Sequence, residues 1–365
     1  MVTVIKQMIH GPLAQSILFQ VHAANPQPAG RRSRVRSIVH HLGRLVELWR
    51  VLGQEAFDVV HIHTCSGFTF YRNLADAALS ALSGSAVVLH IHGGRFERFC
   101  IQAGFLGRWI IRMGLTRADR VVVLSPSWAR RLSRFAPRAR FEVVPNAVAA
   151  EPCFDAHDAS NSHRCCRFVF LGPITRAKGV DVLLRASAEL VRRGLDFHLT
   201  LAGPAESGRD ALDLPALLNE LGMHGHVDPV GTVIGSQKSA LLARSDCLVL
   251  PSLAEGMPLS VLEAGARGLA VIATNVGAVP EMLGDSGSGC VVPPGDILAL
   301  ADRMIWMAAD PDRPKSVGSR LRQRVLENYS LDHQARILSA LYEELARTGN
   351  PSRSVASLAA GGTMP

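Results

Sequence analysis

The sequence contains no hydrophobic run that approaches the length of a membrane-spanning helix. Such a helix needs about 18 to 20 consecutive apolar residues. The chain of 365 residues is 48% hydrophobic, but its apolar runs all end well short of that length. The amino terminus also lacks the pattern of a secretory signal peptide. We therefore expect a protein that stays in the cytoplasm.

Cysteines in the spacing of a zinc site or a disulfide framework are also absent. The seven cysteines are an odd number, and the adjacent pair among them has no second pair with which it could form a metal site. Unpaired thiols of this kind suit a reducing compartment. The seven are Cys65, Cys100, Cys153, Cys165, Cys166, Cys247 and Cys290.

Charge is present but unevenly distributed. Residues 1–150 contain 19 Lys and Arg against 7 Asp and Glu, a balance of +12, whereas residues 151–365 contain 20 against 24, a balance of −4. The first half therefore carries the whole positive excess behind the net charge of +8. A basic half can meet an anionic membrane surface or nucleic acid. We expect no nucleic acid partner, because neither interleaved aromatic residues nor a recognition motif accompanies the charge.

The positive charge is densest in residues 31–50. Apolar residues recur there three and four positions apart, which predicts an amphipathic helix. Two placements of this helix stay open: it lies on a membrane surface, or it packs on the sheet with a solvated basic face. Its arginines are Arg31, Arg32, Arg34, Arg36, Arg44 and Arg50.

The length of the chain and the order of its elements predict two domains. A chain of 365 residues exceeds what one hydrophobic core usually supports. Strand and helix patterns alternate, which is typical of parallel sheets covered by helices. We predict an α/β fold of two doubly wound, Rossmann-like domains that face a cleft. The expected order is an N-terminal domain at 1–150, a linker at 151–166, a C-terminal domain at 167–330, a helix at 331–347 and a disordered tail at 348–365.

The first residues differ from the usual opening of such a domain. A dinucleotide-binding sheet begins with a strand and a glycine-rich turn. Residues 1–9 instead show the spacing of a helix, and a strand is predicted only at 16–21. Either the start codon is assigned too late, which we favour, or the domain lacks its first strand.

The most informative stretch is a strand, a turn and a helix within residues 247–266. The apolar run 247–250 predicts a buried strand, and the following helix is expected to carry Pro258 in its first turn. Glu255 then lies in the turn and Glu263 about one and a half turns into the helix. The two carboxylates can accept hydrogen bonds from hydroxyl groups. Between them, backbone amides without intrahelical acceptors favour a phosphate; these belong to Gly256, Met257, Leu259 and Ser260.

This Glu-x7-Glu stretch, continued by residues 268–281, resembles the donor-site signature of the retaining nucleotide-sugar glycosyltransferases of family 4. The resemblance covers roughly residues 1–347 and implies the GT-B fold, in which the last helix crosses back onto the first domain. It places Glu255 near the hydroxyls of the donor sugar and Glu263 near the ribose. Residues 256–260 would hold the diphosphate of the donor.

The resemblance assigns further donor contacts to the start of the second domain. Lys178-Gly179 matches a Lys-Gly of the family, whose lysine neutralises the donor diphosphate. The arginine that usually precedes it is Pro173 here, so Arg176 is the substitute candidate. Gly203 and Val230 complete the expected donor site. The nucleobase is expected near residues 226–231, around His226, Val230 and Gly231.

Four histidines occur at the ends of two predicted strands in the first domain. His61 and His63 share one face of a strand, as do His90 and His92. A zinc site built from these four is the less favoured interpretation, since no carboxylate is close in sequence. The family resemblance instead places His92 beside the reacting sugar, with Gly93 and Gly94 on the acceptor side.

We expect no metal and no cofactor. Asp310-Pro311-Asp312 has the form of the Asp-x-Asp metal motif of other sugar transferases, but it lies between two predicted helices and is typical of a turn. Lys178 and the helix amides can carry the diphosphate charge.

The function that the resemblance implies is transfer of a sugar from a nucleoside-diphosphate sugar to a glycan or lipid-linked acceptor, with retention of configuration. His92, Lys178 and Glu255 are the expected catalytic residues. The acceptor is expected to be a bacterial exopolysaccharide, capsule or lipopolysaccharide precursor at the inner face of a membrane, with the enzyme peripheral to it. Two alternatives stay open: a GT-B nucleotide-sugar epimerase and a non-catalytic protein that binds sugar nucleotides.

Overall fold

The structure is a computed structural model that describes residues 2–22, 34–151, 165–208, 210–284 and 290–348. The chain forms two compact units. The first unit comprises the residues up to Pro145 together with a carboxyl-terminal segment from Gln334, and the second runs from Asn146 to His333. Most of the predicted linker, residues 152–164, lies outside the described residues, as does the predicted tail at 348–365 apart from Thr348, which belongs to a helix.

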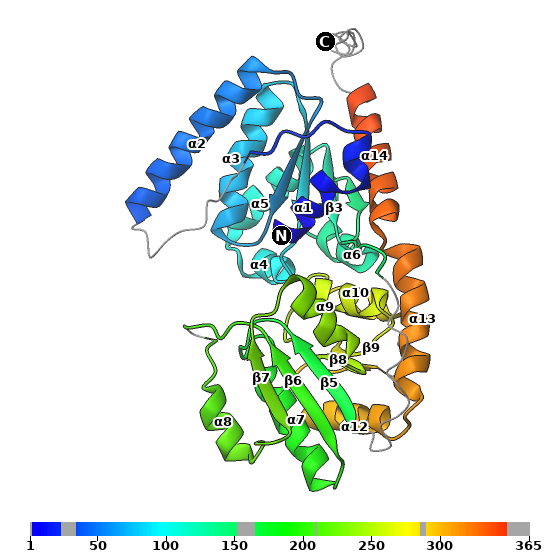
Figure 1. The fold of residues 1–365 in the computed structure, drawn as a ribbon. Helices are drawn as coiled ribbons and strands as arrows, with labels where there is room; N and C mark the ends of the chain where they lie inside the picture. The colour runs from blue at the N-terminus through cyan, green and yellow to red at the C-terminus, as the bar shows by residue number, and fades with distance from the viewer. Residues whose placement is uncertain (1, 23–33, 152–164, 209, 285–289, 349–365) are drawn as a thin grey trace. The chain divides into compact units, whose positions relative to one another are not determined.

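The first unit contains a parallel sheet in the order β1-β2-β3-β4. Its helices lie around this sheet (Figure 1). The strands are β1 (Val59–Thr64), β2 (Ala86–Ile91), β3 (Arg120–Val123) and β4 (Phe141–Val143). The helices are α1 (Val2–His10), the short 3-10 helix η1 (Pro12–Gln15), α2 (Arg34–Gln54), α3 (Phe68–Leu82), α4 (Phe96–Gln102), α5 (Phe105–Arg117), α6 (Pro126–Ser133) and most of α14 (Leu331–Thr348).

Hydrophobic packing between the sheet and α3 to α6 stabilises the first unit. The rings of Phe70 and Phe96 meet edge to face at 5.1 Å, and both side chains are fully buried. Leu89 and Val121 on the strands join the same core. Ser125 caps α6, because its side chain accepts a hydrogen bond from the amide of Trp128.

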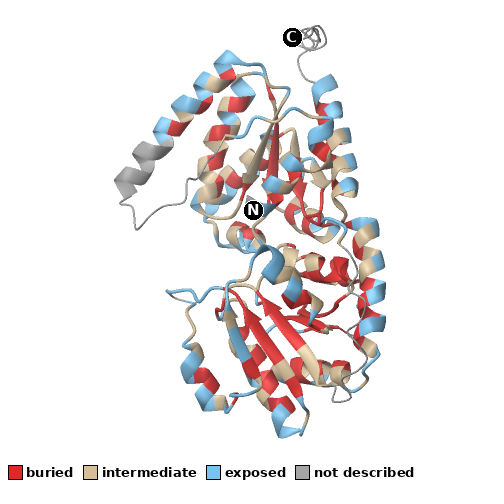
Figure 2. Cartoon of the chain, viewed as in Figure 1, coloured by how far each residue is buried: buried red, intermediate tan, exposed pale blue. Residues whose placement is uncertain are grey.

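The second unit contains a larger parallel sheet in the order β10-β9-β8-β5-β6-β7. Buried residues, red in Figure 2, follow its central strands. The strands are β5 (Cys166–Leu171), β6 (Phe197–Ala202), β7 (Val227–Gly231), β8 (Cys247–Leu250), β9 (Ala270–Thr274) and β10 (Val291–Val292). The helices are α7 (Val180–Arg192), α8 (Leu214–Leu221), α9 (Gly235–Ala243), α10 (Leu259–Ala266), α11 (Val279–Leu283), α12 (Ile297–Ala308) and α13 (Arg313–Asn328).

The strand predicted at 16–21 is wrong. Residues 17–22 form neither helix nor strand, and Leu18 and Val21 are exposed. Alternation of apolar residues is not sufficient for a strand without a neighbour that accepts its hydrogen bonds. Two boundaries also differ: Cys166 belongs to β5 rather than to the linker, and Pro258 is the N-cap of α10 rather than a first-turn residue.

The basic helix predicted at 31–50 is α2, whose described side chains do not form a fully solvated basic face. Arg44 is buried, with 6% of its surface exposed, whereas Leu42, Val46 and Trp49 point outward. The side chains of Arg31, Arg32, Arg34 and Arg36 lie outside the described residues. The described part of α2 therefore presents an apolar stripe to its surroundings.

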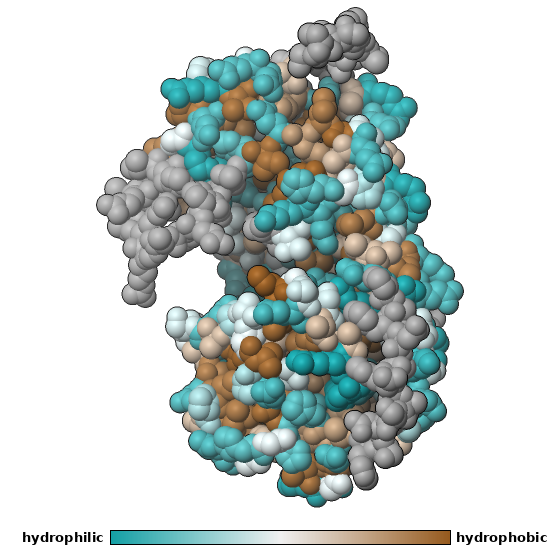
Figure 3. Space-filling view, in the orientation of Figure 1, coloured by the Kyte–Doolittle hydropathy of each residue, from teal (hydrophilic) through white to brown (hydrophobic). Residues whose placement is uncertain are grey.

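None of the described helices combines the length and the apolar character needed to cross a bilayer. The outward side of α14, for example, is hydrophilic and appears teal at the upper right of Figure 3. Its buried side chains, among them Leu338 and Leu341, point to the core of the first unit.

Candidate active site

The two loops predicted to hold a ligand lie next to each other in the second unit. β5 and β8 are adjacent and parallel strands. From β5 the chain continues to β6, toward one edge of the sheet, and from β8 it continues to β9, toward the opposite edge. Open α/β sheets bind ligands at the carboxyl ends of two such strands, where the chain connections change direction. The amide of Leu253, after β8, donates to the carbonyl of Ala177, after β5, at 3.0 Å.

Two glycines, one after β5 and one after β9, allow their loops to approach the loop after β8 closely. Gly179 has a φ of +68°, and a Cβ there would lie 2.0 Å from the carbonyl oxygen of Pro251. Gly277 has a φ of +57°, and its Cβ would lie 2.3 Å from the carbonyl oxygen of Glu255. Only glycine accepts both this conformation and this spacing without strain. The Lys178-Gly179 pair thus has a steric reason for its glycine as well as a chemical reason for its lysine.

Lys178 and Glu255 form an ion pair. Lys178 Nζ lies 2.6 Å from Glu255 Oε1, and the Glu255 side chain keeps only 10% of its surface exposed. The hydroxyl of Ser252 donates to the same Oε1 at 2.6 Å. Thr274 in turn donates to the carbonyl of Ser252 at 2.5 Å. This network orients the carboxylate and brings a cation to the end of β5.

The second glutamate has its own basic partner. Glu263 lies in α10, and Lys238 Nζ of α9 lies 2.7 Å from its Oε1. The backbone carbonyl of Glu263 accepts from Arg267 at 3.1 Å. Glu255 and Glu263 are therefore both held by lysines from neighbouring elements, one on each side of the loop between them.

The loop between the glutamates presents backbone donors. Within the described part of the chain, the amides of Gly256, Met257, Leu259 and Ser260 find no hydrogen-bond acceptor. Asn146 stabilises the loop from beneath, because its side-chain amide donates to the carbonyl of Met257 at 2.8 Å. Amides at the start of a helix, next to a lysine, form an environment that suits a phosphate group.

The other residues expected at the donor site do not all lie at the carboxyl ends of the strands. Arg176 keeps 59% of its side chain exposed and lies 4.0 Å from Asp181. Gly203 follows β6, and a Cβ there would lie 1.8 Å from the carbonyl oxygen of Gly172, so its small size is needed for packing. Val230 is half-buried near the carboxyl end of β7. His226 instead precedes β7 and stacks on Phe197 at 5.3 Å, at the opposite end of the strand.

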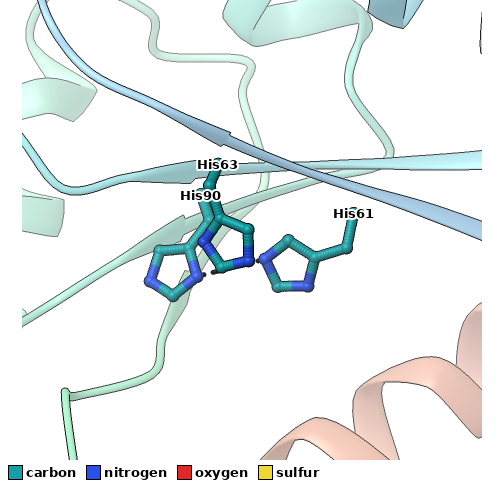
Figure 4. A group of neighbouring side chains, drawn as sticks. All are labelled: His61, His63 and His90. Carbon is teal, nitrogen blue, oxygen red and sulfur yellow. Dashed lines mark hydrogen bonds between the residues drawn. The ribbon is translucent and has the colours of Figure 1, made fainter. Parts of the chain in front are cut away.

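In the first unit, four histidines gather on one face of the sheet. His63 pairs with His90 in the register of β1 and β2, and the rings of His61, His63 and His90 lie together in Figure 4. His61 Nε2 lies 3.1 Å from His90 Nδ1, and His63 Nδ1 lies 2.7 Å from His92 Nε2. Tyr342 of α14 hydrogen-bonds to His61 Nδ1.

These imidazoles are neutral at physiological pH. Burial lowers the pKa of His63 to about 4, and burial together with the neighbouring histidines lowers the pKa of His61, His90 and His92 well below the usual value. A neutral imidazole has one donor and one acceptor nitrogen. Each His–His contact is therefore an N–H···N hydrogen bond. Because His63 occupies Nε2 of His92, Nδ1 is the His92 nitrogen left for a ligand.

Three of these histidines could in principle hold a metal ion. The candidate ligand atoms of His61, His63 and His90 lie within 4.8 Å of one another. The rings of His61 and His63, however, stack with an angle of 11° between their planes. Nitrogen lone pairs lie in the ring plane, so those of stacked rings cannot converge on one ion as tetrahedral coordination requires. The observed geometry is that of a hydrogen-bonded cluster.

Sequence reasoning missed three residues that hold this site together: Ser252, Lys238 and Asn146. Ser252 lies only three residues before Glu255, and this short separation could have indicated that the two are partners. The pairing of Lys238 with Glu263 depends on how α9 packs against α10. Asn146 reaches Met257 across 111 positions of the sequence, which no local pattern can indicate.

Comparison with known proteins identifies both units. A family model described as "Glycosyl transferase 4-like domain" matches residues 15–147, and one described as "Glycosyl transferases group 1" matches residues 165–310. The chain is 26% identical over 316 residues to alpha-D-kanosaminyltransferase of Streptomyces kanamyceticus, covering 78% of this chain and 77% of the relative. It is 27% identical over 326 residues to alpha-maltose-1-phosphate synthase of Mycolicibacterium smegmatis, covering 82% of each.

Solved structures show the same fold. Sucrose-phosphate synthase from Thermosynechococcus elongatus superposes with a TM-score of 0.73 at 21% identity, covering 87% of this chain and 81% of the other. Anabaena HepE in complex with UDP-glucose gives a TM-score of 0.68 at 16% identity, covering 82% of each chain. The predicted pair of Rossmann-like domains is therefore confirmed.

The two family models match consecutive parts of the chain, and the relatives are transferases and synthases of sugars. These findings favour transfer over the two alternatives, an epimerase and a non-catalytic binding protein. The chain belongs to glycosyltransferase family 4, has the GT-B fold and is an enzyme of the hexosyltransferase class.

Proposed function

We propose that the enzyme transfers a sugar from a nucleoside-diphosphate sugar to a glycan or lipid-linked acceptor, with retention of the anomeric configuration. The observation that supports this most directly is the Lys178–Glu255 ion pair, formed by the loops that follow the adjacent strands β5 and β8. A cation, a carboxylate and backbone donors occur together there. That combination suits a ligand with a diphosphate beside hydroxyl groups.

In this proposal the diphosphate is held by Lys178 and by the amides of Gly256 to Ser260. Arg176, which is exposed and weakly paired, can turn toward the same phosphates. These groups stabilise the negative charge that develops on the departing diphosphate. The donor therefore competes with Glu255 for Lys178, and the released carboxylate accepts hydrogen bonds from hydroxyls of the sugar.

The other end of the donor lies toward Glu263. The Glu263 carboxylate, already fixed by Lys238, accepts from the ribose hydroxyls. Val230 and Gly203, which lie at the carboxyl ends of β7 and β6, border the nucleoside. No metal or cofactor is required in this scheme, since cationic side chains and amides carry the diphosphate charge.

On the acceptor side, the proposal uses His92 together with Gly93 and Gly94. The Nδ1 of His92, which has no partner among the described residues, binds a sugar hydroxyl, while the hydrogen bond between Nε2 and His63 fixes the orientation of the ring. A donor phosphate oxygen takes the acceptor proton, so the proposal needs no protein base at this step. It also assigns no protein nucleophile. The acceptor that we propose is a bacterial cell-envelope glycan precursor such as one for exopolysaccharide, capsule or lipopolysaccharide, encountered at the cytoplasmic face of the membrane.

The experiment is turnover on a panel of nucleotide sugars with candidate acceptors, with the anomeric configuration of the product read by NMR. We expect one donor class to give a product of unchanged configuration. Lys178→Ala should lower kcat by roughly a hundredfold or more. Lys315→Ala makes the same change at an exposed lysine of the same unit and should leave turnover unchanged. Inversion of configuration, or an unaltered rate in Lys178→Ala, would refute the scheme.

A further inference from the structure

The histidine cluster of the first unit has a partner that the proposed function does not use. Tyr342 lies in α14, 281 positions after His61 in the sequence, and its hydroxyl hydrogen-bonds to His61 Nδ1. The two rings meet edge to face, with 5.8 Å between their centroids. Only 8% of the Tyr342 surface is exposed. The last helix of the first unit therefore contacts the cluster that contains His92.

The chemistry of these groups sets the direction of the hydrogen bonds. A phenol is a stronger hydrogen-bond donor than the N–H of a neutral imidazole, and the imidazole nitrogen is the stronger acceptor, so Tyr342 donates to His61 Nδ1. Burial raises the pKa of Tyr342, which keeps the hydroxyl protonated. Neutral His61 then carries its proton on Nε2 and donates to His90 Nδ1 at 3.1 Å, the bond that the dashed line in Figure 4 marks. His90 in turn carries its proton on Nε2.

Packing alone does not explain why residue 90 is a histidine. His90 is fully buried, and within the described part of the chain its Nε2 has no hydrogen-bond partner. A buried N–H without an acceptor is unfavourable, whereas an apolar side chain on this strand would avoid that cost. The neighbours of His90 on β2, Leu89 and Ile91, are such side chains. The useful contacts of His90 are therefore its hydrogen bond with His61 and the face of its ring.

Two contacts hold the ring of His92, one at its edge and one on its face. At the edge, His92 Nε2 lies 2.7 Å from His63 Nδ1. On the face, the ring of His90 lies 4.0 Å away between centroids, with 29° between the two planes. One hydrogen bond leaves a ring able to turn about the line that joins the two nitrogens, and a stacked neighbour prevents that rotation. The direction of His92 Nδ1 therefore depends on His90 as well as on His63.

We propose that Tyr342 is a positioning residue for His92 and acts through His61 and His90. The hydroxyl of Tyr342 fixes the ring of His61, the N–H of His61 fixes the ring of His90, and His90 fixes His92 by stacking. This inference rests on the proposed function for the role of His92 toward the acceptor. The chain of contacts itself does not depend on that role, and Tyr342 contacts no substrate in this scheme.

The first test is NMR of the full chain with isotope-labelled histidines, of which the sequence has 14. The nitrogen chemical shifts of a neutral imidazole differ between its two tautomers, and we expect His61 and His90 to carry the proton on Nε2. Tyr342→Phe removes one hydroxyl and keeps the ring that packs in the core, so the variant should fold. His61 should then populate both tautomers, and the order parameter of the His92 Cε1–H bond should fall from about 0.85 to about 0.6 or less.

The matched control is Tyr71→Phe, which removes the same group from a half-buried tyrosine of α3. The Tyr71 ring packs against Phe99 at 5.5 Å, and none of its described ring contacts involves a histidine, so His92 should keep its order parameter. The route is tested in His61→Phe, which keeps an aromatic ring without the nitrogens. Adding Tyr342→Phe to His61→Phe should cause no further loss of order at His92.

Three results would overturn the proposal. They are an equally rigid His92 ring in Tyr342→Phe, an equal loss of order in Tyr71→Phe, and a further loss when Tyr342→Phe is added to His61→Phe. A purely structural role of Tyr342 would give the first of these results together with a lower melting temperature.

Turnover separates this inference from the proposed function. With the donor and acceptor that react fastest in the nucleotide-sugar panel, Tyr342→Phe should raise the KM for the acceptor about threefold to tenfold. The KM for the donor should stay unchanged, because the donor contacts belong to the second unit. An unchanged acceptor KM would contradict the positioning role, whereas no turnover in the wild type would refute the proposed function and leave the NMR prediction in force.

Discussion

The histidine cluster predicts that the first unit loses stability in mild acid. His63 has a pKa of about 4 in the folded protein, against an ordinary value of 6.5, because of its burial. The unfolded chain therefore binds a proton below about pH 6.5 that the folded chain binds only near pH 4. The contribution of neutral His63 to the free energy of unfolding is fully present above about pH 6.5, and it is lost as the pH falls from about 6.5 to about 4.

The size of the effect follows from the same two pKa values. Between about pH 7.5 and about pH 5.0, His63 alone lowers the free energy of unfolding by about 2 kcal/mol. For a domain of this size, that change lowers the melting temperature by roughly 4 to 8 °C. His61, His90 and His92 shift in the same direction, so they add to the loss.

Differential scanning calorimetry at the two pH values measures this loss, and His63→Asn isolates its source. The free energy of unfolding should differ between the two pH values by about 2 kcal/mol less in the variant than in the wild type. His224→Asn, at an exposed position in the second unit, is the control and should leave the difference unchanged. An acid loss of the same size in wild type and His63→Asn would refute the reasoning.

Three further predictions concern the second unit. Gly179→Ala forces a side chain into a left-handed conformation against Pro251 and should cost roughly 2 kcal/mol or more in thermal unfolding; an unchanged melting temperature would contradict the close contact between the two loops. Ser252→Ala removes the hydrogen bond to Glu255 and should reduce turnover severalfold without loss of folding, and equal kcat values would show that this bond does not orient the carboxylate. Asn146→Ala leaves the carbonyl of Met257 without its donor and should lower the free energy of unfolding in denaturant by about 1 to 3 kcal/mol. An unchanged free energy of unfolding would show that Asn146 does not support the loop.

The sequence was sufficient to predict the two parallel sheets and most of their elements. Apolar runs such as 247–250 are continuous because the strand is buried on both faces, and helices follow them at regular intervals. The turn at Asp310-Pro311-Asp312 is confirmed, since the amide of Asp312 donates to Asp310 Oδ1 at 3.0 Å. Where the prediction failed, at residues 16–21, a local pattern lacked a tertiary partner.

The contacts within the site could not be predicted in the same way. Lys178 and Glu255 were expected to bind one ligand, but nothing in their separation of 77 positions indicates that they bind each other. His63 and His92 were expected at the ends of two strands, yet the hydrogen bond between them depends on ring orientation. Such features arise from packing between elements rather than from periodicity within one.

The central claim is that Lys178 binds the diphosphate of the donor. Isothermal titration calorimetry with the nucleoside diphosphate of the preferred donor tests it, using wild type, Lys178→Met and the exposed control Lys315→Met. The account predicts that Lys178→Met weakens binding of the nucleoside diphosphate about tenfold or more, whereas the control leaves it unchanged. Affinity for the corresponding nucleoside should be the same in all three proteins. Equal diphosphate affinity in wild type and Lys178→Met would contradict it.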